Sequence, residues 1–201
     1  MAANGSSSPQ SASGRLPLGP GRVVLVVGPS GAGKDAILQM VQEGLTQDPR
    51  FVFPRRIVTR VATSAEDHDA ISSDGFDARL KSGAFALHWQ AHGLSYGIPS
   101  RIDNAVQQGN TVVFNASRQV IAETKSRYTC LVVLVDAPQH MRAQRLANRN
   151  RERPEDVSAR LERVVASFST HECDFIIENT GTLAEASERF TRWLVAQASA
   201  A

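Results

Sequence analysis

Short continuous runs of apolar residues alternate with longer amphipathic stretches along most of the chain. The clearest runs are Val23–Val27, Thr111–Asn115, Cys130–Val135 and Phe175–Ile177. Runs of this length, apolar at nearly every position, are typical of strands buried on both faces of a parallel sheet. Two weaker strand candidates lie at 56–59 and 84–90.

The stretches between these runs predict helices. They cover residues 34–45, 74–82, 102–108, 118–127, 136–147, 154–168 and 183–196. In the second of them Phe76 and Leu80 are four residues apart and share one helix face. Strands that alternate with helices predict an α/β fold, in which a parallel sheet is covered by helices on both faces. The 201 residues suit one such domain, which we expect at 21–196.

The N-terminal residues 1–20 are rich in Ser, Ala, Gly and Pro, which predicts a disordered tail. No charged start followed by an apolar stretch is present, so the tail is not a secretory signal. No apolar run approaches the ~20 residues of a membrane span. Cys130 and Cys173 lack metal-ligand spacing, and Cys130 lies in an apolar run, which favours a buried thiol over a disulfide. We therefore expect a cytoplasmic protein.

The formal net charge is only +2, and no basic block interleaved with aromatic residues is present. Nucleic acid is therefore not expected as a partner, nor is a membrane. The sequence leaves open whether the chain is a monomer or a homodimer.

A glycine-rich turn joins the first predicted strand to the first predicted helix. Its residues are Gly28, Pro29, Ser30, Gly31, Ala32, Gly33, Lys34 and Asp35. The glycines let backbone N–H groups converge on phosphate oxygens, and the helix N-terminus favours anions. Lys34 is placed to reach the β- and γ-phosphates of a nucleotide. A turn that only caps a helix would explain Gly28 and Gly33 but not Lys34, so we predict a P-loop that binds ATP.

Asp35 occupies the position at which a Ser or Thr hydroxyl normally ligates magnesium. A carboxylate is a hard oxygen ligand, so Asp35 is our candidate for holding Mg²⁺, directly or through water. It also brings a negative charge close to the phosphates.

Arginines cluster after the third long apolar run, at positions 142, 145, 149, 151, 153, 160 and 163. Phosphoryl transfer requires several cationic groups around the moving phosphoryl group. The segment 142–163 therefore fits a mobile lid, with Arg145, Arg149 and Arg160 as the catalytic candidates. The alternative is a solvated basic face that pairs with neighbouring acidic residues.

The region 56–99 combines short strands with polar loops, including an expected loop at 92–99, and we interpret it as an acceptor-binding insertion. An Arg fork suits phosphate, carboxylates suit sugar hydroxyls or magnesium waters, and residues that follow a buried strand lie where open α/β sheets bind ligands. The candidates for binding the acceptor are Arg60, Glu66, Asp67, Asp69, Tyr96, Asn115 and Arg118. A plain polar surface loop is the alternative for residues 66–69.

The order of these motifs resembles that of the guanylate-kinase-like nucleoside monophosphate kinases, over about Val23 to Trp193. The motifs are Gly28–Asp35, Thr59–Arg60, Glu66–Asp69, Ser95–Gly97, Arg145 with Arg149 and Arg160, and Asp174 with Asn179. The resemblance implies a P-loop NTPase-type parallel sheet, an acceptor-binding region and an arginine lid. It also implies that Asn179 lies near the adenine of ATP.

The sequence departs from that family where guanine would be read. A second Arg is replaced by Thr63, a phosphate-binding Tyr by Ser72, and the guanine-reading Glu by Leu87, or by His88 if the loop shifts by one position. The small hydroxyl residue after Tyr96-Gly97 is Ile98. A site loses base discrimination when hydrogen-bonding partners become apolar, so guanine is not the expected acceptor.

Asp35, the Trp89–Pro99 stretch and Asn115–Arg118 resemble instead one branch of these kinases, the ribose 1,5-bisphosphate phosphokinases of bacterial phosphonate breakdown. That resemblance implies ATP-dependent phosphorylation of a sugar phosphate to 5-phosphoribosyl 1-diphosphate. The acceptor phosphate oxygen is already anionic, so positioning and charge neutralisation suffice without a general base. A guanylate kinase with unusual base contacts and a non-enzymatic binding module remain as alternatives.

Overall fold

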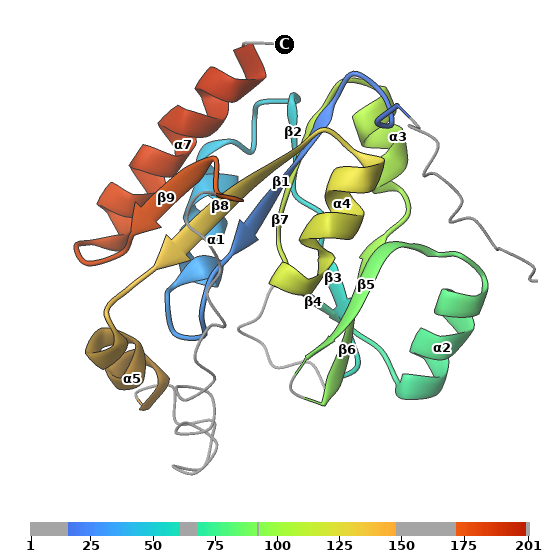
Figure 1. Ribbon diagram of the computed structural model, residues 1–201, viewed down its shortest axis with the longest axis horizontal. Coiled ribbons are helices and arrows are strands. Elements are labelled where there is room, and N and C mark those ends of the chain that lie inside the picture. Colours follow the sequence, from blue (N-terminus) through green and yellow to red (C-terminus); the bar gives the residue numbers. More distant parts are fainter. Residues whose placement is uncertain (1–15, 61–67, 92, 148–171, 200–201) are drawn as a thin grey trace, which may run out of the picture.

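A computed structural model describes residues 16–60, 68–91, 93–147 and 172–199, and a five-stranded parallel sheet forms its centre (Figure 1). The strands are β1 (Arg22–Val27), β2 (Phe51–Val52), β7 (Thr111–Asn115), β8 (Cys130–Asp136) and β9 (Phe175–Glu178). Their order is β2-β7-β1-β8-β9. The central strand β1 is buried from Val23 onward, because it pairs with β7 on one side and β8 on the other. The predicted α/β fold with a parallel sheet is confirmed.

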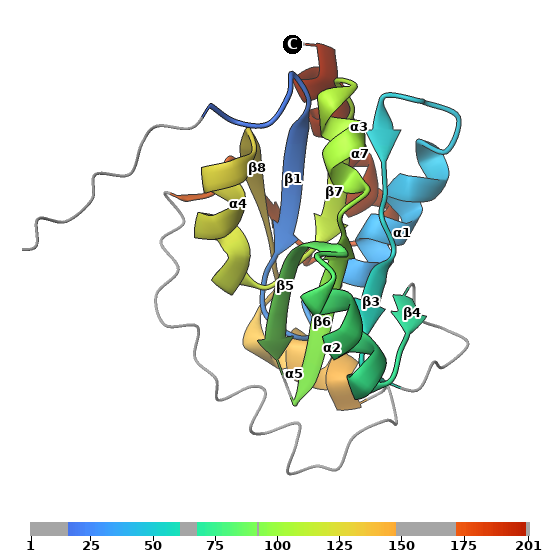
Figure 2. The same cartoon turned by 90° about the vertical axis from the view of Figure 1, so that its right-hand side faces the viewer.

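Helices cover both faces of this sheet (Figures 1 and 2). On one face α1 (Lys34–Gly44) and α7 (Leu183–Ser199) pack against Val24 and Val26 of β1. On the other face α3 (Ile102–Gln107), the 3₁₀ turn η1 (Arg118–Val120) and α4 (Ile121–Arg127) pack against Leu25. Successive side chains of a strand point to opposite faces, so one apolar run supplies both cores.

A second, four-stranded sheet corresponds to the region predicted to bind the acceptor (Figure 2). Its strands are β3 (Arg56–Val58), β4 (His68–Ala70), β5 (Phe85–Ala91) and β6 (Leu94–Pro99), in the order β4-β3-β6-β5. Helix α2 (Ser73–Lys81) packs on it, with the Phe76 and Phe85 rings stacked at 4.6 Å between centroids.

The loop predicted at 92–99 is wrong, because β6 occupies most of it. β5 and β6 form an antiparallel hairpin, in which Gly93 supplies a positive φ of 71°. The Trp89 ring stacks on Tyr96 across the pair, at 5.4 Å between centroids. Neither β4 nor β2 was among the strands expected from the sequence.

The folded part of the chain also begins earlier than predicted. Leu18 was placed in the disordered tail, but its backbone N–H donates a 2.8 Å hydrogen bond to the Arg127 carbonyl. Its side chain packs against the core on the α4 face. The helix expected at 118–127 is divided into η1 and α4, and α5 (Gln139–Ala147) follows Pro138. The helix expected at 154–168 lies outside the described residues.

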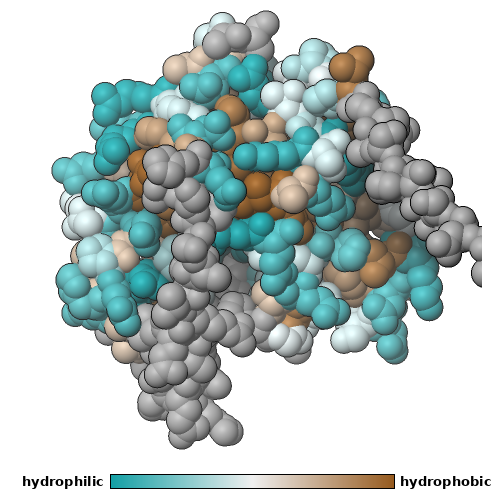
Figure 3. Space-filling model, viewed as in Figure 1, coloured by the Kyte–Doolittle hydropathy of each residue, from teal (hydrophilic) through white to brown (hydrophobic). Residues whose placement is uncertain are grey.

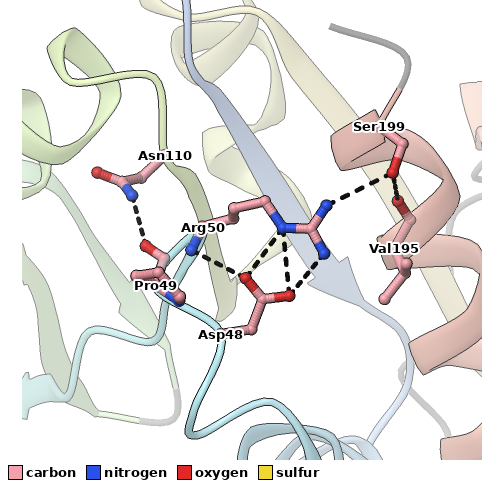
Figure 4. A network of polar contacts seen from close by, with 6 residues as sticks. All are labelled: Asp48, Pro49, Arg50, Asn110, Val195 and Ser199. Carbon is pink, nitrogen blue, oxygen red and sulfur yellow. Dashed lines mark hydrogen bonds and ion pairs between the residues drawn. The ribbon is translucent and has the colours of Figure 1, made fainter.

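A polar network ties the turn before β2 to the end of α7 (Figure 4). Arg50 Nη2 lies 2.6 Å from Asp48 Oδ2, and Arg50 Nη1 lies 3.5 Å from the Ser199 hydroxyl. The hydrogen bond from Arg50 holds the pKa of the Asp48 carboxyl below its ordinary value. Asn110 Nδ2 donates a 2.7 Å hydrogen bond to the Pro49 carbonyl, which connects the start of β7 to the same turn.

Hydrophilic side chains predominate on the described surface drawn in Figure 3. No helix within the described ranges combines the length and the apolar character needed to cross a membrane.

Candidate active site

The predicted P-loop forms the turn between β1 and α1. Gly28, Gly31 and Gly33 have φ values of 148°, 79° and 93°, and Gly33 caps the N-terminus of α1. The backbones of β8 and α5 approach the loop closely: a Cβ on Gly31 would lie 2.7 Å from the Arg142 carbonyl, and one on Gly28 would collide with that of Val135. Glycine is therefore required both by the backbone conformation and by the lack of space.

Lys34 folds back over this turn. Its Nζ donates to the Gly28 carbonyl at 2.8 Å and to the Pro29 carbonyl at 2.9 Å. The ammonium group therefore lies beside the curled backbone, at the N-terminus of α1. A concave turn of N–H groups, a helix N-terminus and one lysine together suit a chain of phosphates.

Asp35 is held by residues from two other elements. Its Oδ1 accepts a 2.7 Å hydrogen bond from Asn115 Nδ2 at the end of β7 and lies 3.1 Å from Arg56 Nη2 at the start of β3. The Asp35 side chain is 56% exposed, and that of Arg56 is 20% exposed. Asp35 and Asn115, both predicted site residues, are thus brought together. Arg56 was missed, because no motif marks it.

A magnesium ion is compatible with this arrangement. Mg²⁺ is usually bound by one or two carboxylates together with phosphate oxygens and waters, rather than by an all-protein cage. Within the described ranges no group of three or more His, Cys, Asp or Glu residues could hold a metal. The exposed Asp35 carboxylate next to the P-loop therefore fits an ion that arrives with nucleotide phosphates.

Arg145 and Asn179 also meet at the P-loop. Arg145 Nη2 donates to the Asn179 carbonyl at 3.0 Å, and Asn179 Nδ2 donates to the Ala32 carbonyl at 2.8 Å. Asn179 is only 1% exposed, and its Oδ1 is buried without a hydrogen-bond partner among the described residues. The adenine contact expected of Asn179 stays a prediction.

The candidates for acceptor binding are more scattered. Arg118 lies half-buried in η1; burial lowers the pKa of its guanidinium, while the charge of Asp136 at the end of β8 opposes that shift. Tyr96 stacks on Trp89 in the second sheet, and Asp69 pairs with Arg55 at 3.0 Å on an exposed edge. Arg60 lies two positions beyond the end of β3. Glu66, Asp67, Arg149 and Arg160 lie outside the described residues.

A cavity of about 300 Å³ opens where β5 of the second sheet meets α2 and α4. The side chains that surround it are mainly polar. They include His88, Gln90, Ser95, Gln119 and Glu123. The second sheet, α2, η1 and α4 therefore surround a space that is lined by both polar and apolar side chains.

The Guanylate kinase family model matches residues 20–197, nearly the whole chain. The chain belongs to the guanylate kinase family. A guanylate kinase from Anaplasma phagocytophilum has the same fold, with a TM-score of 0.63 and 17% identity over 90% of this chain and 88% of that one.

The chain is also similar to proteins named ribose 1,5-bisphosphate phosphokinase PhnN. The protein of that name from Bradyrhizobium diazoefficiens is 45% identical over 87% of this chain and 88% of its own length. The one from Acidiphilium cryptum is 46% identical over 85% of this chain and 90% of its own length.

In this member of the guanylate kinase family, residues at several of the positions expected to recognise guanine are buried in the core or cap a helix. Leu87 and Ile98 are fully buried in the core on the α4 face. The Ser72 hydroxyl caps α2 by accepting a 3.1 Å hydrogen bond from the Gly75 N–H. Thr63 lies outside the described residues. Leu87 and Ile98 offer no hydrogen bond to a base.

Proposed function

We propose that this protein is a ribose 1,5-bisphosphate phosphokinase, which uses ATP to make 5-phosphoribosyl 1-diphosphate and ADP. The observation that carries the proposal is the 45% identity, over 87% of the chain, to a protein of that name. The buried, apolar Leu87 and Ile98 support it, because a guanine-reading site would need polar groups at those positions; His88, the other expected position, lines the cavity. Cytoplasmic phosphonate breakdown is the proposed context.

The proposed reaction moves the γ-phosphoryl group of ATP to the 1-phosphate of the sugar. The bond between the γ-phosphorus and the bridging β–γ oxygen breaks, and ADP leaves with that electron pair. A phosphate oxygen of the acceptor forms the new bond to phosphorus. Because this oxygen is already anionic, the protein's task is to align the reactants and to neutralise charge.

On the ATP side, we assign the phosphates to the turn 28–35, whose glycines allow backbone N–H groups to surround them. Lys34 would contact the β- and γ-phosphates. Asp35 would hold Mg²⁺, which neutralises phosphate charge when it is bound. Asn179 Oδ1, buried without a partner among the described residues, would accept a hydrogen bond from the adenine amino group.

On the acceptor side, we assign the region 56–99 to sugar bisphosphate binding and 142–163 to a lid of the single domain 21–196. Two phosphates need cations at both ends, and Arg60 and Arg118 are the proposed residues. Asn115 and Tyr96 would add neutral donors, and the acidic residues 66, 67 and 69 would hold sugar hydroxyls. Arg145, which already contacts the P-loop carbonyl of Ala32, would act with the lid residues Arg149 and Arg160.

A coupled ADP-release assay tests the proposal. Purified protein is given ATP and Mg²⁺ with either ribose 1,5-bisphosphate or GMP. We expect turnover with the sugar and little or none with GMP, and product analysis should show 5-phosphoribosyl 1-diphosphate in equal amount to ADP. Turnover of GMP alone would establish a guanylate kinase instead. ATP binding without turnover of either compound would support a binding module.

A further inference from the structure

The Asp35–Arg56 ion pair connects the P-loop helix to the sheet that is proposed to bind the acceptor. Arg56 opens β3, and its Nη2 lies 3.1 Å from Asp35 Oδ1. The same Asp35 oxygen accepts the 2.7 Å bond from Asn115. Three elements that are far apart in the sequence, α1, β3 and β7, therefore converge on one carboxylate oxygen directly after Lys34.

Two side chains of opposite charge, Asp35 and Arg56, meet beside the P-loop. Asp35 places a negative charge beside a loop that is shaped for phosphates, where a hydroxyl would be neutral. Arg56 supplies a compensating positive charge through its 3.1 Å contact with Asp35 Oδ1. With its side chain 20% exposed, Arg56 is largely enclosed but still partly open to solvent.

Distance limits which arginine can bind the acceptor phosphate. The attacking oxygen must come within about 3–3.5 Å of the γ-phosphorus, which the P-loop holds. Among the arginines of the second sheet for which the structure describes ion pairs, Arg56 is the one that contacts the P-loop helix, whereas Arg55 turns to Asp69. A guanidinium has five N–H donors in a planar fork, so it can hold a carboxylate and a phosphate at the same time.

We propose that Arg56, in addition to Arg60 and Arg118, binds the acceptor phosphate that lies beside the P-loop, and that Asp35 and Asn115 are positioning residues that aim its guanidinium there. Arg56 then determines specificity, because it selects an acceptor that presents a phosphate at this point. The inference rests on the proposed function and deepens it by naming the residue that meets the reacting phosphate.

The test compares Arg56→Gln with Arg79→Gln, which removes the same charge from an exposed site in the last turn of α2. Both variants are assayed with ribose 1,5-bisphosphate at saturating ATP and Mg²⁺, and ATP binding is measured separately by calorimetry. Loss of a charged hydrogen bond should raise KM for the sugar about 10- to 100-fold in Arg56→Gln, with ATP affinity nearly unchanged. Arg79→Gln should behave as the wild type.

Two further variants separate contact from positioning. Arg56→Lys keeps the charge without the planar fork, so it should recover part of the lost sugar affinity. Asp35→Asn should raise the sugar KM by itself but add little to that KM on the Arg56→Gln background, because both changes disable the same guanidinium; the effect of Asp35→Asn through Mg²⁺ is followed separately in kcat and in ATP binding. Full additivity of the two changes would refute the positioning role of Asp35.

The outcomes also separate this inference from the function on which it rests. A wild type that does not turn over the sugar overturns the proposed function and the inference together. An active wild type whose sugar KM is altered no more by Arg56→Gln than by Arg79→Gln overturns the inference alone. If Arg56→Gln does not fold, Arg56→Lys replaces it in the comparison. A sugar KM above those of the wild type and Arg79→Gln then supports the inference, and an unaltered sugar KM overturns it.

Discussion

The side-chain amide of Asn179 donates a 2.8 Å hydrogen bond to the carbonyl of Ala32, 147 positions earlier in the chain. This bond fixes the middle of the P-loop to the segment between β9 and α7. The Asn179 backbone carbonyl in turn accepts from Arg145 at 3.0 Å, which adds α5 to the same contact. The loop that is proposed to hold phosphates is therefore shaped by the far end of the sheet as well as by its own glycines.

Replacing Asn179 with Ala should destabilise the protein and weaken ATP binding. The change leaves the buried Ala32 carbonyl without this donor, which costs about 1–3 kcal/mol. Urea unfolding measures the stability, and calorimetry with ATP measures the affinity. The exposed neighbour Thr180 gives the control, since Thr180→Ala should change stability by less than about 0.5 kcal/mol. Equal behaviour of the two variants would contradict a structural role for Asn179.

Gly33→Ala should also disrupt the hydrogen bond between Asn179 and the Ala32 carbonyl, in this case by a change in the P-loop. Gly33 has a φ of 93°, and an added Cβ would collide with the Asn179 amide nitrogen. We expect a loss of about 1–3 kcal/mol and of ATP binding, from backbone strain and displacement of Asn179. Combining it with Asn179→Ala should cost less than the sum of the single changes, because the collision disappears.

Gly44 is the matched control for that substitution. It ends α1, and a Cβ there would have no neighbour within 4 Å. Gly44→Ala should therefore be neutral or stabilise the protein by up to about 1 kcal/mol. A Gly33→Ala protein as stable as Gly44→Ala would show that the loop tolerates a side chain.

Lys34→Ala should abolish phosphoryl transfer and leave the fold intact. Lys34 Nζ donates to the Gly28 and Pro29 carbonyls, in a turn whose backbone conformation is already set by its glycines, so the fold should survive the loss of the ammonium group. Loss of a cationic group at the transferring phosphates typically lowers kcat by about 10²–10³-fold or more. ADP release gives the rate and thermal unfolding gives the stability. Lys81→Ala, in the last turn of α2, is the control, and an active Lys34→Ala enzyme would refute the P-loop assignment.

The P-loop and the central strands were predictable because their signals are local. Gly28, Gly33 and Lys34 lie within one short turn, and the apolar runs of β1 and β8 are continuous. The β6 strand was missed although Leu94, Tyr96 and Ile98 alternate, because Gly93 and Pro99 suggested a loop. The two-residue strand β2 is too short to produce a pattern, and pairing with Thr111 defines it.

The site was predictable only in part, for a related reason. Asp35 was singled out by the motif that contains it, but its partners Arg56 and Asn115 are 21 and 80 positions away. Arg56 was expected only as part of a short strand, and no motif marked it as a site residue. Such contacts depend on how the two sheets are arranged relative to each other. They join residues that are far apart in the sequence, so they leave no local motif.

We expect the free energy of unfolding to decrease in alkaline solution because of the titration of Tyr128. Burial, reinforced by the hydrogen bond from its hydroxyl to Asp103, raises the pKa of Tyr128 above the ordinary value of 10.0. Above that ordinary value the unfolded chain loses the proton while the folded protein keeps it. The stabilisation is therefore complete below about pH 10 and is lost as pH rises toward the folded-state pKa.

Tyr128→Phe tests this pH dependence. The variant should be about 1 kcal/mol less stable at pH 7, because Asp103 loses a donor. Its stability should then decline less steeply above pH 9.5 than that of the wild type, as measured by urea unfolding across the alkaline range. Parallel curves for Tyr128→Phe and wild type would show that Tyr128 does not titrate as argued.

Cys130 should react with alkylating reagents only after unfolding. It is a free thiol in β8, and burial raises its pKa to about 12. The thiolate is the reactive form, so at pH 8 the folded protein should label at this site about a thousandfold more slowly than an ordinary thiol does. Cys173→Ser isolates Cys130 for iodoacetamide labelling followed by mass spectrometry, and denaturant should restore fast labelling. Rapid labelling of folded Cys173→Ser protein would mean that the thiol on β8 is open to solvent and not enclosed by the core beneath α4.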